Sequence, residues 1–156
     1  MKVLSETLAP VAGSEPVANT FTLPQGLIGF RDFTRAELLS QPDQLPFLWM
    51  KLSSPTESVH FIVIEPGGLI PNYTPEIFDN DADALALSCP GEAMVLNIVT
   101  LEQQNPLEAK VNLIGPIIVN RRTRIGRQLV ISNYSRYSAH HPLIENPAPA
   151  PAAATA

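Results

Sequence analysis

Hydrophobic residues along this chain form short runs, some alternating with polar residues and some uninterrupted. In residues 17–23 (VANTFTL), Val17, Phe21 and Leu23 fall on one side of an extended chain. The other runs are rich in aromatic and β-branched residues: 46–52, 59–65, 93–101, 109–114, 116–120 and 127–132. Pro, Gly, Asn or Asp bounds each run, and this spacing is typical of antiparallel hairpins. Several runs are apolar on both faces, as expected of strands buried between layers or wrapped into a barrel.

Two short segments have a helical pattern instead. Residues 31–40 (RDFTRAELLS) are predicted to begin a helix at Asp32 or Thr34. The side chains that this helix would bury are Phe33, Leu38 and Leu39. Residues 79–88 (DNDADALALS) are predicted to form a second helix. Asp79 or Asp81 would cap it, because a carboxylate there accepts first-turn N–H bonds and suits the helix dipole.

These elements define an all-β fold. The strand-like runs do not alternate with helices of about a dozen residues, which disfavours a parallel α/β sheet. The sequence predicts a small antiparallel β-barrel-like domain with one or two short helices, spanning residues 1–145. Residues 146–156 (NPAPAPAAATA) contain no core-forming residue and are expected to be a disordered tail.

Composition narrows the class of protein further. Of 156 residues, 45% are hydrophobic, enough for a core without a disulfide or metal staple. The single cysteine, Cys89, lies in the apolar run LALSC and is expected to be a buried, inert thiol. The N-terminus lacks the apolar core of a signal peptide, and no run is long enough to span a membrane. We therefore expect a soluble, cytoplasmic protein.

The net charge of −5 disfavours general nucleic-acid binding and suits a positively charged partner. Acidic residues are concentrated around the second predicted helix: Glu76, Asp79, Asp81 and Asp83. The three aspartates are spaced as at the start of an EF-hand loop. However, Ala84 stands where that loop needs glycine and Pro90 where it needs glutamate. The interpretation is an acidic surface for a basic partner.

Catalytic and metal-binding patterns are missing from the sequence. His140 and His141 are adjacent and have no further cysteines or histidines nearby to complete a zinc site. Neither a G-x-S-x-G elbow nor a phosphate-binding glycine loop is present. We expect no catalytic residue, metal or cofactor; a metal-dependent or nucleophilic enzyme is the third alternative.

A glycine-spaced segment precedes the first predicted helix. GLIGF (26–30) is interpreted as a bend, permitted by glycine, that inserts Leu27 or Phe30 into the core. Phe30 and Arg31, beside this bend, are further candidates for partner contact.

Four of the chain's 10 basic Lys and Arg residues lie within seven positions, Arg121 to Arg127. The pattern predicts a hairpin: residues 117–119 in one strand, 121–126 in the turn, and 129–131 in the return strand. Gly126 is expected to supply a positive φ in the turn. The arginines either solvate and protect an apolar hairpin, or form an RNA-binding tip. The second reading is the main alternative function.

The order of these motifs resembles the FliW family of flagellar assembly factors. The resemblance covers roughly residues 17–145. Its pattern residues are Phe21, Gly26, Leu27, Gly29, Phe30, Val99, Thr100, Asn112, Leu113, Pro116, Ile117, Asn120, Gln128, Val130, Ile131, Tyr137, His141, Pro142 and Leu143. Ile28 stands where the family usually has proline, Gly115 replaces a frequent alanine, and Leu129 interrupts a Gln-Val pair.

The resemblance implies a function that the residues alone do not give. FliW proteins are non-enzymatic, β-barrel-like proteins that bind CsrA, a dimeric RNA-binding repressor, and thereby relieve repression of flagellin translation. They also bind flagellin, which can displace CsrA. For this chain the resemblance implies CsrA and flagellin as partners, with no direct binding of nucleic acid or membrane. Most pattern residues are Gly, Pro, Asn or apolar, so they are expected to hold the fold.

Overall fold

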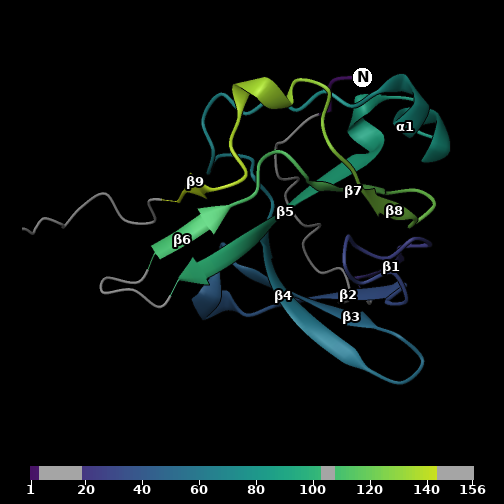
Figure 1. The fold of residues 1–156 in the computed structure, drawn as a ribbon, viewed down its shortest axis with the longest axis vertical. Coiled ribbons are helices and arrows are strands. Elements are labelled where there is room, and N and C mark those ends of the chain that lie inside the picture. Colours follow the sequence, from purple (N-terminus) through teal and green to yellow (C-terminus); the bar gives the residue numbers. More distant parts are fainter. Residues whose placement is uncertain (4–18, 103–107, 144–156) are drawn as a thin grey trace, which may run out of the picture.

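The computed structural model describes residues 1–3, 19–102 and 108–143. Within them the chain is mostly antiparallel β-structure, which confirms the predicted all-β class (Figure 1). The strands are β1 Thr20–Thr22, β2 Arg35–Ser40, β3 Leu48–Ser53, β4 Ser58–Ile64, β5 Ala93–Glu102, β6 Glu108–Val111, β7 Ile117–Asn120, β8 Gly126–Gln128 and β9 His141–Pro142. The helices are α1 Asp79–Ala84 and the 3₁₀ turns η1 Pro42–Gln44, η2 Pro90–Glu92 and η3 Tyr134–Arg136. The tail predicted at residues 146–156 lies outside the described residues.

The sheet branches at the long strand β5. The path runs β1-β2-β3-β4-β5, with β4 pairing Ile62 to Val99 on one edge of β5. On the other edge, β6 pairs with the C-terminal half of β5 and β7 with the N-terminal half. Strand β9 extends the β6 branch, and β8 extends the β7 branch. Strand β5 is therefore shared by the β6-β9 and β7-β8 branches, which diverge in Figure 1.

The β7 branch closes the sheet on itself. The Thr22 N–H in β1 donates to the carbonyl of Arg124, 2.9 Å away, just before β8. Thr22 also forms a parallel bridge with Ile125. These contacts complete the ring β1-β2-β3-β4-β5-β7-β8 and give the sheet its barrel-like shape. Closure also leaves fewer open strand edges.

Two apolar clusters fill the molecule on opposite sides of β5 and β7. Met94 and Leu96 in β5 face the barrel interior together with Ile117 and Val119 of β7. Val95 faces the second cluster, which lies under α1 and the preceding loop. Because side chains of a strand alternate between faces, β5 and β7 are buried on both sides. This explains their uninterrupted apolar runs in the sequence.

The helix predicted over residues 31–40 is wrong. Residues Arg35–Ser40 form strand β2, paired along its whole length with β3. Ala36 is buried in the barrel and Leu38 packs against the same cluster, whereas Leu39 points outward with 39% of its surface exposed. Cross-strand pairing overrides the helical propensity of Ala, Glu and Leu.

The second predicted helix is confirmed, but its predicted cap is wrong. Helix α1 spans Asp79–Ala84 and Phe78 is its N-cap residue, with no side-chain capping bond. The Phe78 carbonyl accepts hydrogen bonds from the N–H groups of Asp81 and Ala82. Within the described residues, no helix is long and apolar enough to cross a membrane.

The predicted hairpin around the arginines is formed by β7 and β8, with two corrections. The positive φ in the turn belongs to Arg124 (60°), whereas Gly126 is already paired with Val119 in the strand. A Cβ at Gly126 would lie 2.8 Å from Val119 Cγ2, so this glycine permits close packing. Residues 129–131 follow β8 and are outside it, although the Leu129 N–H still bonds to the Pro116 carbonyl.

Candidate partner-binding surface

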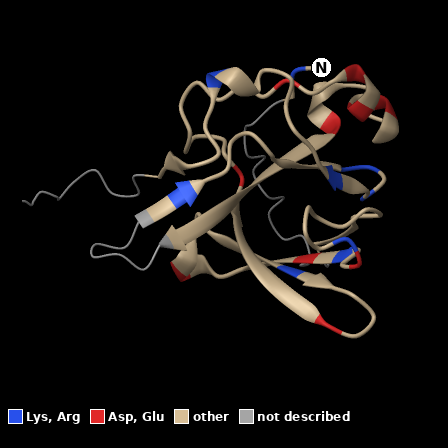
Figure 2. Ribbon diagram, viewed as in Figure 1, with Lys and Arg blue, Asp and Glu red and all other residues tan. Residues whose placement is uncertain are grey.

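The predicted acidic surface is formed by α1 and the chain before it. Figure 2 shows the acidic residues gathered on α1, close to basic residues on β8 and its preceding turn. Asp79 and Asp83 are exposed, and Asp81 is half-buried. Phe78, at the start of the helix, has 51% of its surface exposed. The surface thus combines carboxylates with an aromatic ring.

Two of the three helix carboxylates have a cationic neighbour in the protein. Asp79 Oδ1 lies 3.8 Å from the N-terminal amine of Met1, but 97% of the Asp79 side chain is exposed. Asp81 Oδ1 lies 3.4 Å from Nη1 of Arg127, and only 20% of the Asp81 side chain is exposed. Asp81 therefore ties α1 to β8, whereas Asp79 and Asp83 face solvent.

Glu76 differs from the carboxylates of α1 because its backbone makes structural contacts. Its N–H donates to Oδ1 of Asn133 at 3.0 Å, and its carbonyl accepts the N–H of Ser132 at 2.6 Å. Lys2 forms a β-bridge with it on the other side. The backbone of Glu76 thus joins Lys2 to the segment just before η3, and its side chain is half-buried.

The GLIGF segment forms a tight turn. Leu27 and Phe30 exchange two main-chain hydrogen bonds, with Ile28 and Gly29 at the tip. Gly29 has φ +89°, as a type II turn requires at its third position. Gly26 has φ +63°, and a Cβ there would lie 2.1 Å from the carbonyl oxygen of Phe30. Both glycines are therefore structural requirements of the turn.

The turn buries Leu27 and half-buries Phe30, which confirms the predicted insertion into the core. The Phe30 ring packs edge-on against Phe33 and Phe61, with centroids 5.6 and 5.2 Å away. Phe30 thus supports the turn from within. Arg31 is exposed, and Ile28 at the tip is 75% exposed, the highest value among the exposed large hydrophobic residues of the described chain.

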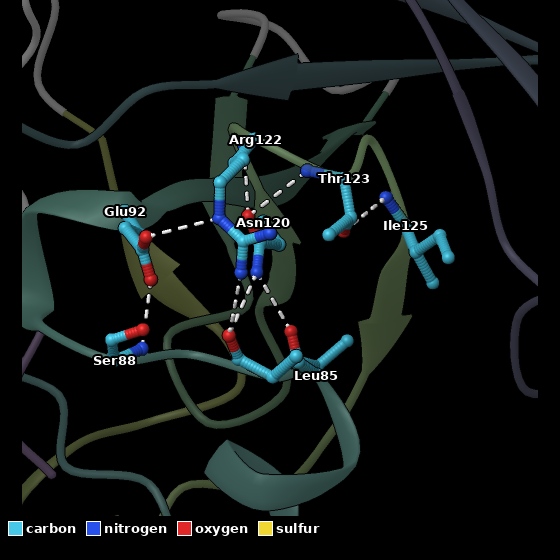
Figure 3. Close-up of polar contacts among 8 residues, drawn as sticks. Leu85, Ser88, Glu92, Asn120, Arg122, Thr123 and Ile125 are labelled. Atoms are coloured by element: carbon cyan, nitrogen blue, oxygen red, sulfur yellow. Dashed lines mark hydrogen bonds and ion pairs between the residues drawn. The ribbon is translucent and has the colours of Figure 1, made fainter.

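A buried asparagine organises the arginine-rich turn (Figure 3). Asn120 is fully buried, and its Nδ2 donates to the carbonyls of Leu85 (2.8 Å) and Ala86 (3.2 Å) after α1. Its Oδ1 accepts the N–H groups of Arg122 (2.8 Å) and Thr123 (3.2 Å). One side chain therefore fixes both the turn and the end of α1.

Two of the four arginines in and beside the turn, Arg122 and Arg127, form ion pairs within the protein. Arg122 Nε donates to Oε2 of Glu92 at 3.3 Å, and Arg127 pairs with Asp81. The Nε of Arg121 is buried without a hydrogen-bond partner in the described residues. Arg124 is exposed and carries the strained positive φ. The turn therefore does not present four free cations to a nucleic acid.

The pKa values of two carboxyl groups near this turn, Glu65 and Glu92, are shifted in opposite directions. Burial raises the pKa of Glu65, and the Arg121 charge opposes this shift only partly. The Ser88 N–H, which donates to Oε1 of Glu92 at 2.7 Å, lowers the Glu92 pKa with help from Arg122. Glu92 is therefore held as an anion, whereas ionised Glu65 is disfavoured by its surroundings.

The remaining residues of the family pattern hold the chain in place. Asn112 Oδ1 accepts the N–H groups of Ile114 and Gly115, and forms an Asx turn before β7. Pro116 is buried, and its carbonyl bonds to the residue after β8. The Tyr137 ring packs edge-on against Tyr73 at 4.9 Å, and its hydroxyl donates to the Asn72 carbonyl at 3.2 Å. His141 and Pro142 form β9.

Sequence reasoning missed the role of Gln128. Its Oε1 accepts the Ile28 N–H at 3.1 Å, and its Nε2 donates to the Gly115 carbonyl at 3.1 Å. This side chain therefore joins the GLIGF turn to β8 and to the start of β7. A polar residue inside an apolar run was the available signal, but it does not identify a contact 100 positions away.

Cys89 was predicted to be buried, and this is wrong, because it is exposed. It lies between α1 and η2, where Ser88, Cys89 and Pro90 are all exposed, so the apolar run that contains it ends at the surface. Among the described residues, no three His, Cys, Asp or Glu side chains are grouped to hold a metal ion.

The fold defines the class: a small, mostly antiparallel β protein with a closed, barrel-like sheet and a short helix. The FliW protein family model matches residues 10–143, and the chain belongs to the FliW family. This family comprises non-enzymatic assembly factors.

Known proteins agree with this assignment. The chain is 35% identical to the flagellar assembly factor FliW of Natranaerobius thermophilus over 146 residues, 94% of each protein. It is 33% identical to that of Leptospira biflexa over 123 residues, 79% of each. A crystal structure of the flagellar assembly factor FliW superposes with a TM-score of 0.69 at 24% identity, covering 93% of this chain and 98% of that one. The structure supports the shared fold, and the sequence relatives support the family.

Proposed function

We propose that this protein is a cytoplasmic flagellar assembly factor that binds two proteins, the translational repressor CsrA and flagellin. Binding sequesters CsrA and relieves repression of flagellin synthesis, and binding of flagellin couples its level to flagellum assembly in a chaperone-like way. The observation that carries this proposal is the family match over residues 10–143, together with relatives named flagellar assembly factors.

The surface of α1 is our candidate for CsrA binding. CsrA binds RNA, and RNA-binding surfaces are basic, so an acidic surface complements it. Asp79 and Asp83 are the carboxylates there whose side chains face solvent, while Asp81 is held by Arg127. Phe78 adds an exposed aromatic ring of the kind that anchors interfaces.

The test is calorimetric titration of the protein with CsrA and flagellin from the same organism. The double variant Asp79→Lys, Asp83→Lys reverses the exposed charges and spares the half-buried Glu76 and Asp81. We expect its CsrA affinity to fall about tenfold or more, because like charges oppose association. The matched control is Asp43→Lys, Glu57→Lys, which makes the same charge change at exposed positions on η1 and in the β3–β4 turn.

Two results would count against this proposal in different ways. If the unaltered protein binds neither CsrA nor flagellin, the assigned function is wrong. If it binds CsrA and both double variants bind equally well, the function stands and the α1 surface is not the interface.

Direct RNA binding through the arginine turn is the weaker alternative, because Arg122 and Arg127 are paired with carboxylates. It predicts RNA affinity that falls steeply with salt and is lost when Arg121, Arg122, Arg124 and Arg127 become serine. A filter-binding titration at two salt concentrations distinguishes it from the proposal above.

A further inference from the structure

The GLIGF turn presents an exposed apolar side chain on a rigid support. Ile28 is 75% exposed, although burial of a side chain of this type is ordinarily favourable. Its N–H is held by Gln128, and its neighbour Leu27 is only 3% exposed and belongs to the barrel core. An apolar residue fixed in this way loses little conformational entropy on binding, which is the property of an interface anchor.

The surroundings of Ile28 are hollow and basic. A surface hollow of about 610 Å³ is lined by the turn that carries Ile28 and by Arg31, Arg127 and Gln128. Two arginines and no carboxylate line it, in a protein with a net charge of −5. Asp81 approaches from α1 and pairs with Arg127, and Asp32 follows Arg31 in the chain. Arg31 has no ion pair within the described residues.

We propose that this hollow binds an acidic segment of a protein partner, with an apolar partner side chain against Ile28 and a carboxylate on Arg31. Arginine binds carboxylates in a paired, directional geometry, and the apolar contact excludes water around it. This surface meets the acidic surface of α1 at the Arg127–Asp81 ion pair. It suits an acidic partner, whereas the α1 surface suits a basic one. The inference deepens the proposed function, because CsrA is assigned to the α1 surface and flagellin is left as the partner for this hollow. Only this naming of flagellin rests on the proposed function.

The direct test does not depend on that name. A ¹⁵N-labelled protein is titrated with a capped peptide of alternating Glu and Leu, and separately with its Lys and Leu counterpart. We expect saturable amide shifts at Ile28, Gly29, Arg31 and Gln128 with the Glu peptide alone. Shifts elsewhere, equal shifts with the Lys peptide, or no saturable shift would overturn the proposal.

Variants then assign the partner. Ile28→Ser and Arg31→Glu should each weaken flagellin binding about tenfold or more while changing CsrA binding less than about twofold. Arg124→Glu is the charge-matched control, because Arg124 is exposed but lines a different hollow. Thermal unfolding of each variant verifies the fold. Loss of CsrA binding instead, or no loss of either, would contradict an acidic occupant at this surface.

Discussion

At the scale of single residues, alanine substitution at two glycines distinguishes the cost of backbone strain from the cost of a steric clash. Gly26 and Gly68 both have positive φ, +63° and +79°. A Cβ at Gly68 would meet nothing within 4 Å, whereas at Gly26 it would lie 2.1 Å from the Phe30 carbonyl oxygen. Gly68→Ala should lower the free energy of unfolding by about 1–2 kcal/mol through φ alone. Gly26→Ala should cost roughly twice as much or more, because the turn must also move.

Urea unfolding of the two variants measures this difference. Equal losses would mean that the turn relaxes without cost around a methyl group at position 26.

Cys89 provides a second prediction at this scale. Because its side chain is exposed, it should react with a thiol reagent such as Ellman's reagent in the folded protein. We expect one thiol per chain to be titrated under native conditions, at a rate close to that in urea. A thiol that reacts only after unfolding would restore the buried position expected from the sequence.

The same scale shows what the sequence could and could not reveal about the candidate site. The sequence predicts an acidic face of Glu76, Asp79, Asp81 and Asp83, because helix position and charge are local properties. Asp79 and Asp83 are exposed on it, whereas Glu76 and Asp81 are half-buried. Ile28 was noted only as a departure from proline. Its N–H is held by Gln128 from a distant strand, and no local pattern encodes such a contact.

At the scale of elements, the strands were predictable where apolar runs were long and buried on both faces, as in β5 and β7. The failure at Arg35–Ser40 has a physical cause. Its residues favour a helix by propensity, but pairing with β3 places Ala36 inside the barrel and the charged Arg35 outside. Only the tertiary arrangement could decide between these two outcomes.

Asn120 links elements that the sequence separates, and this predicts a large effect of its loss. Asn120→Ala would leave the Leu85 carbonyl and the N–H groups of Arg122 and Thr123 without their partner. We expect unfolding to become easier by roughly 2–4 kcal/mol, because buried polar groups without partners are costly. Asn80→Ala, at an exposed position of α1, is the control and should change stability by less than about 0.5 kcal/mol. Chemical denaturation compares the two, and a similar effect of both would contradict the bridging role.

At the scale of the whole molecule, stability should depend on pH through Glu65. Burial raises its pKa in the folded state, so the folded protein holds this proton more tightly than the unfolded chain. The contribution is absent at low pH and becomes a penalty as pH rises through the unfolded and then the folded pKa. Glu65→Gln should therefore raise the melting temperature near pH 7 and have little effect near pH 4.

Calorimetry across this pH range tests the prediction, with Glu57→Gln in the exposed β3–β4 turn as the control. A lower melting temperature for Glu65→Gln at neutral pH would mean that attraction to Arg121 outweighs the cost of burial.

The joint between Thr22 and Arg124 has a consequence for how the protein is made. These residues lie about a hundred positions apart, so synthesis must pass Ile125 before the ring can close. Until then, any sheet formed by the first strands has an unpaired edge, which favours pairing with other chains. We therefore expect a chain that ends before Arg124 to aggregate more readily than one that extends beyond Ile125.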